Sequence, residues 1–90
     1  MVDFYYEISM DFYLYEYTPI FYRQSFTSLY DLEITFDYLA GMAIRLTEKH
    51  DTGAFKSIII RKIIREEGED GLKVKTYRFK DGKRYKEEYI

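Results

Sequence analysis

Residues 28–50, SLYDLEITFDYLAGMAIRLTEKH, constrain the fold most, because they are the one clearly helical stretch in a chain that otherwise alternates like β-strands. Their apolar stripe, spaced by three and four residues as on one face of a helix, consists of Leu29, Leu32, Phe36, Leu39, Ala43 and Leu46. Ser28 is the predicted N-cap, and Gly53 is the predicted stop. Such a helix is roughly 33 Å long, so the surface that it covers must be equally long.

Gly41 is the exception within this helical stretch. A glycine in the middle of a helix costs about 1 kcal/mol relative to alanine. We predict that it allows the helix backbone to approach a bulky aromatic side chain on the sheet. A hinge or a ligand contact is the alternative.

The rest of the chain reads as strands, because its side chains alternate in chemical character with a period of two. Residues 4–17 and 20–26 form the first two predicted strands, and their short link favours an antiparallel pair. Residues 72–80 and 83–89 form the last two, joined at Asp81-Gly82, a strong hairpin signal. The chain therefore begins and ends in predicted antiparallel pairs.

Residues 54–67 contain five isoleucines, whose β-branching favours a strand. The apolar phase shifts near Arg61-Lys62, which predicts a bulge, and a helix ending at Gly68 is the alternative. With this strand the element order is ββαβββ. We predict an α+β fold in which an antiparallel, twisted sheet of about five strands carries one long helix packed across one face.

Composition limits the class of protein. Ninety residues make a single domain, residues 1–90. The chain has no cysteine, which excludes disulfides, thiolate metal sites and cysteine nucleophiles. No basic residue precedes Arg23, so the chain does not begin like a secretory signal, and IIIRKII is too short and too charged to span a bilayer. We expect a cytoplasmic protein with no membrane partner.

Catalysis is not expected. His50 is the only histidine, and no nucleophile and base can be assigned around it. The acidic run EEGEDG lacks the alternating oxygens and the distal glutamate of a calcium loop, and no phosphate-binding glycine loop is present. We therefore predict no enzymatic activity, no metal site and no cofactor.

A single helix covers only one face of such a sheet, and exposed aromatics on the other face usually mark an interface. The chain is rich in them, with 11 Tyr and 7 Phe. The predicted aromatics of the uncovered face are Tyr5, Tyr13, Tyr15 and Tyr17, with Tyr77, Phe79 and Tyr85 or Tyr89. This face is where we expect the function to lie.

The N-terminal part of that face is also acidic. Residues 1–40 hold seven acids against one base, whereas residues 41–90 hold thirteen bases against nine acids. The leading hypothesis is a protein-binding module, such as a small inhibitor or accessory protein of a mobile element, that occupies a basic site on a partner protein. Its predicted partner-binding residues are Tyr5, Glu7, Asp11, Tyr13, Tyr15 and Tyr17. The same strip could instead form a homodimer, and a structural homo-oligomer is the third hypothesis.

The alternative function is binding of single-stranded nucleic acid by the basic, aromatic C-terminal hairpin. There the cations would follow the phosphates and the aromatics would stack on bases. The predicted residues are Lys73, Lys75, Tyr77, Arg78 and Phe79. A solvated edge protected by lysines is the competing interpretation.

Overall fold

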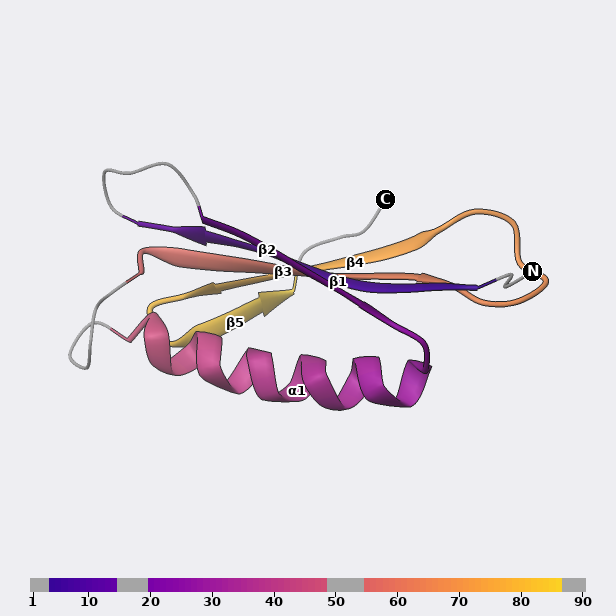
Figure 1. Cartoon of the computed structure of the whole chain (residues 1–90). Coiled ribbons are helices and arrows are strands. Elements are labelled where there is room, and N and C mark those ends of the chain that lie inside the picture. Colours follow the sequence, from indigo (N-terminus) through magenta and orange to yellow (C-terminus); the bar gives the residue numbers. More distant parts are fainter. Residues whose placement is uncertain (1–3, 15–19, 49–54, 87–90) are drawn as a thin grey trace.

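The computed structural model describes residues 4–14, 20–48 and 55–86. These form five strands and one helix: β1 (Tyr5–Tyr13), β2 (Ile20–Phe26), α1 (Leu29–Leu46), β3 (Ser57–Arg65), β4 (Lys73–Lys80) and β5 (Lys83–Lys86). The strands form one antiparallel sheet in the order β2-β1-β3-β4-β5. The sheet is twisted, and α1 lies along one of its faces (Figure 1). The predicted α+β architecture and its element order are confirmed.

The helix begins where the sequence predicts and ends earlier. The backbone N–H of Asp31 donates to Ser28 Oγ at 3.3 Å, so Ser28 is the N-cap. The prediction that the helix continues to His50 is wrong, because α1 ends at Leu46 and Thr47 caps it. The Thr47 hydroxyl donates to the carbonyl of Ala43 and accepts from the N–H of Gly82. The predicted stop at Gly53 lies outside the described residues.

The core lies between α1 and the sheet. The even-numbered residues of β1 and β3 and the odd-numbered residues of β4 share this covered face, as the strand register requires. Most of the predicted helix stripe is buried there, and Leu29 and Leu46 are half-buried. The core residues are Ile8, Met10, Leu32, Phe36, Leu39, Ala40, Ala43, Ile58, Ile60, Tyr77 and Phe79.

β3 is a strand, as predicted, but the bulge expected near Arg61-Lys62 is wrong. Its pairing with β1 and with β4 runs through both residues without interruption. The apparent phase shift arises because isoleucines serve both faces: Ile58 and Ile60 lie under the helix, and Ile59 and Ile63 lie on the opposite face. Ile59 is only 9% exposed although it lies on the open face, because β3 is flanked by β1 and β4, so the sequence of this strand need not alternate.

The explanation offered for Gly41 is also wrong. A Cβ atom built on Gly41 would have no atom of the described residues within 4 Å, so no described aromatic side chain of the sheet approaches it. Gly41 lies on the side of α1 away from the core. The nearby buried residues Leu39, Ala40 and Ala43 all lie on the opposite side of the helix, which faces the sheet. The presence of Gly41 therefore has no cause in the described packing.

The Asp81-Gly82 hairpin is confirmed. Asp81 and Gly82 both have positive φ, 55° and 73°, as a two-residue type I′ turn requires. A Cβ on Gly82 would also lie 2.7 Å from Glu48 Cγ, so glycine is needed where this turn meets the end of the helix. In the part of the chain that is described, no helix has the length and apolar character needed to cross a bilayer.

Candidate functional site

The face of the sheet opposite α1 is called the open face here. It consists of the odd-numbered residues of β1, β2, β3 and β5 and the even-numbered residues of β4, since paired residues share a face. Tyr5, Glu7, Asp11 and Tyr13 lie on it together, as the partner-binding hypothesis predicts. Tyr15 and Tyr17 lie outside the described residues.

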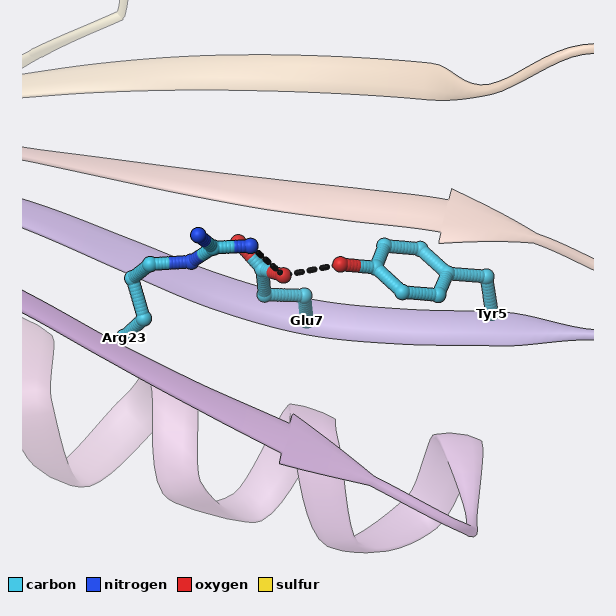
Figure 2. Close-up of polar contacts among 3 residues, drawn as sticks. All are labelled: Tyr5, Glu7 and Arg23. Carbon is cyan, nitrogen blue, oxygen red and sulfur yellow. Dashed lines mark hydrogen bonds and ion pairs between the residues drawn. The ribbon is translucent and has the colours of Figure 1, made fainter.

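A three-residue polar cluster occupies this face at β1 and β2 (Figure 2). Arg23 donates from Nε to Glu7 Oε2 at 3.1 Å and from an Nη atom to Glu7 Oε1 at 2.9 Å, and the Tyr5 hydroxyl donates to Glu7 Oε1. The hydrogen bonds from Arg23 hold the pKa of the Glu7 carboxyl below its ordinary value. The hydrogen bond to Glu7 raises the pKa of the Tyr5 phenol. Glu7 is buried, and both of its carboxylate oxygens accept hydrogen bonds from residues of this chain.

Asp11, the second acid predicted on this face, is also paired with an arginine of this chain. Asp11 accepts from an Nη atom of Arg61 on β3 at 2.8 Å, and its side chain is only 17% exposed. Both described carboxylates of the predicted acidic face are therefore neutralised by arginines of this chain. A basic partner would have to displace these arginines to reach the carboxylates, so charge gives the leading hypothesis little support.

The open face is in fact basic. Against the two paired acids, its described strand residues include six cations: Arg23, Arg61, Arg65, Arg78, Lys80 and Lys83. The net charge of −2 for the whole chain hides this, because exposed acids such as Asp31 and Asp37 lie on the helix, on the other side of the sheet. The two sides of the molecule therefore differ in sign.

Two of these cations, Arg78 and Lys80, line two adjoining depressions on this face. The first, of about 270 Å³, is lined by Tyr13, Lys56, Ser57, Ile59, Arg78 and Lys80. The second, of about 370 Å³, is lined by Arg78, Lys80, Asp81 and Tyr85. Because both contain Arg78 and Lys80, they form one feature, which we call the basic hollow. Tyr13 on β1 and Tyr85 on β5 lie at its two ends, separated by three strand spacings and by two residues along the strands, roughly 16 Å between the backbones.

The predicted nucleic-acid-binding set is divided between the two faces. Arg78 lies on the open face and lines the basic hollow. Lys73, Lys75, Tyr77 and Phe79 lie on the covered face, so the prediction that Tyr77 and Phe79 are open-face aromatics is wrong. Phe79 is fully buried, and the Tyr77 ring packs on Phe36 with a centroid distance of 5.0 Å. Neither ring can stack on a base.

Sequence reasoning counted Lys80 among the cations of the C-terminal hairpin but left it out of the predicted binding set, and it missed Lys56. Lys80 follows Arg78 at the period of two, which was a usable signal once Phe79 is recognised as a core residue. Lys56 precedes β3 and reaches the site only because β3 lies between β1 and β4. No local pattern could have found it.

The basic hollow offers ammonium and guanidinium donors, the carboxylate of Asp81, two phenol rings and an apolar floor at Ile59. Among the described residues, no group of three His, Cys, Asp or Glu side chains is arranged to hold a metal ion. No known protein family, curated protein or solved structure shows a significant match to the chain. The assignment therefore depends on the geometry of the site.

Proposed function

We propose that this protein binds single-stranded nucleic acid, without catalysis, through the basic hollow and the open face around it. The observation that carries the proposal is the convergence of Lys56, Arg78 and Lys80 between Tyr13 and Tyr85. Cations along a groove neutralise phosphates and release counterions. Tyrosine rings stack on bases of any sequence, and each stacked base contributes about 1–3 kcal/mol.

A single strand suits this site better than a duplex does. The depressions are shallow and lie across strands of a sheet, whereas duplex readout usually places a helix or a two-stranded ribbon in a groove. Unstacked bases can reach an aromatic ring on a sheet surface. Two tyrosines whose backbones are roughly 16 Å apart, with cations between them, leave room for the phosphates that join two stacked bases.

The test is fluorescence anisotropy of labelled single-stranded and duplex oligonucleotides at two salt concentrations. Arg78→Glu with Lys80→Glu is expected to weaken single-strand binding about tenfold or more and to flatten its salt dependence. Lys73→Glu with Lys75→Glu is the matched control. It makes the same change in charge on the same strand, but on the covered face, and should alter affinity by less than about threefold, because only long-range repulsion acts.

Two results would contradict the proposal. If wild type shows no binding at low salt, the basic hollow does not take nucleic acid. Equal losses in both double variants would show that net charge, and not the hollow, determines affinity. A Tyr13→Ala variant separates stacking from charge, since it should weaken binding with the salt slope unchanged.

Binding of another protein is the second candidate, favoured by the edge strand β2. Ile20, Phe21 and Tyr22 are 51%, 58% and 39% exposed on it. An exposed edge of this kind accepts an added strand from a partner. Selection of binders from a displayed peptide library would test it. Sequences with alternating apolar residues should be enriched, and a Tyr22→Asp variant should select none of them.

A further inference from the structure

The outer surface of α1, which points away from the sheet (Figure 1), carries apolar side chains that the fold does not use. Tyr30, Ile34 and Tyr38 are 73%, 50% and 67% exposed. Their spacing of four places them along one stripe of the helix. Gly41 continues this stripe one turn further on. An amphipathic helix that needed only to cover the sheet would have polar residues here.

Gly41 is an independent sign that this stripe meets another backbone. It weakens an interior helical position by about 1 kcal/mol relative to alanine, yet a Cβ at this position would touch nothing in the described chain. A glycine on a helix surface lets a neighbouring helix come closer than the usual 8–10 Å between axes. The surface thus combines exposed apolar groups with a place for close contact.

The charges on this surface are complementary to those on the same surface of a second copy. Asp31, Tyr38 and Arg45 are spaced by seven residues and therefore lie on one edge of the stripe. If a second copy of the helix is laid against the first in the antiparallel direction, centred at Tyr38, each Asp31 lies opposite the Arg45 of the other copy. In nearly the same register each Ile34 lies opposite the other copy's Gly41. Antiparallel alignment also pairs the opposite ends of the two helix dipoles.

We propose that the protein forms a symmetric dimer in which α1 packs on α1 of a second copy, antiparallel, with Ile34 over Gly41. The interface is isologous and closed, so association ends at two copies. The sheets lie on the outside of such a pair, and both open faces stay accessible. Two sites in one particle would raise the avidity for a long nucleic-acid strand. That last consequence depends on the proposed function, but the dimer itself does not.

Sedimentation equilibrium without nucleic acid, from micromolar to millimolar protein, tests the dimer. Ile34→Asp should weaken association by at least about a hundredfold, because it buries a charge against an apolar surface and Gly41. Ile20→Asp is the matched control, since Ile20 is 51% exposed but lies on β2, and it should leave the dimer unchanged. Loss of the dimer in Ile20→Asp alone would place the interface at the β2 edge and overturn the proposal, as would a wild-type monomer at every concentration.

Two conservative changes give effects of opposite sign. Asp31→Asn removes the partner of Arg45 and should weaken association about two- to fivefold. Asp37 lies on the other edge of the stripe and, in this register, within about two residues of its own copy along the helix axis, roughly 3 Å, so Asp37→Asn should strengthen association by a similar factor. Both changes remove one negative charge. Equal effects of the two would show that only net charge matters and would refute this register. Circular dichroism confirms folding of every variant.

Discussion

The two faces of the sheet are stabilised in different ways, although the same strands build both. On the covered face, apolar side chains pack under α1, and the fully buried Phe79 and Ile60 are typical of it. On the open face no described helix or strand forms a second layer, yet Glu7 and Ser9 are buried. Here arginines from neighbouring strands lie across β1, with Arg23 bound to Glu7 and Arg61 bound to Asp11. Cross-strand ion pairs thus shield the middle of the sheet on the face that α1 does not cover.

The largest expected difference is between two neighbours on β4. Phe79→Ala should lower the free energy of unfolding by about 3–5 kcal/mol, because it leaves a cavity under the helix. Lys80→Ala, one residue further and on the open face, should change it by no more than about 0.5 kcal/mol. Urea denaturation of both variants measures this. Similar losses at the two positions would mean that the two faces are not distinct in packing.

The next effect tests the ion pairs of the open face. Glu7→Gln should cost about 1–2 kcal/mol at neutral pH, since hydrogen bonds to a charged group are lost but Arg23 remains solvated. The pKa of Glu7 is lowered from 4.5 in the folded protein. Its contribution is therefore complete above pH 4.5 and disappears as the pH falls through the lower folded-state pKa.

Thermal unfolding across this acid range is the measurement for Glu7. The difference between wild type and Glu7→Gln should vanish in strong acid. Glu67→Gln, the same change at an exposed glutamate, should show no comparable difference at neutral pH. A Glu7→Gln difference that stays constant with pH would show that packing, and not charge, explains the loss.

The smallest effect concerns Lys62, a cation held under the helix. Lys62 Nζ donates to Glu33 at 2.9 Å and lies 4.6 Å from the centre of the Phe36 ring. Lys62→Met keeps the apolar stem but loses the charge, and should cost about 0.5–1 kcal/mol. Lys75→Met, at an exposed lysine on the same face, should be neutral within about 0.5 kcal/mol. Denaturation at low and high salt distinguishes the two, and a loss at Lys62 that grows with salt would contradict an electrostatic cause.

The sequence was sufficient for the fold because each local signal agreed with the others. Alternation in residues 4–13, the stripe of α1 and the Asp81-Gly82 turn each indicate one element, and these elements combine in few ways. Alternation divides a strand into two sets of side chains, but it does not say which set faces the helix. On β4 both sets contain cations, so Tyr77 and Phe79 were assigned to the wrong face.

The candidate site was less predictable, because it depends on strand order. Arg61 neutralises Asp11 from 50 positions along the chain, and Lys56 joins Tyr13 and Arg78 only through the central position of β3. Electrostatic character is a property of the assembled face, whereas a count of charges by segment describes the chain. Glu7 and Asp11, which lie in the acidic N-terminal part of the sequence, therefore belong to a basic surface of the folded protein.

The central place of β1 and β3 has a consequence for folding kinetics. The β1–β2 hairpin, α1 and the β4–β5 hairpin involve neighbours in sequence and can form early. The pairing of β1 with β3 joins Tyr5 to Arg65 and must close a loop that includes β2 and α1. Closing it loses chain entropy before any contact compensates for it. We therefore expect the β1–β3 ladder to form last, so that until then the inner edge of β1 is the part of a half-folded chain most open to aggregation.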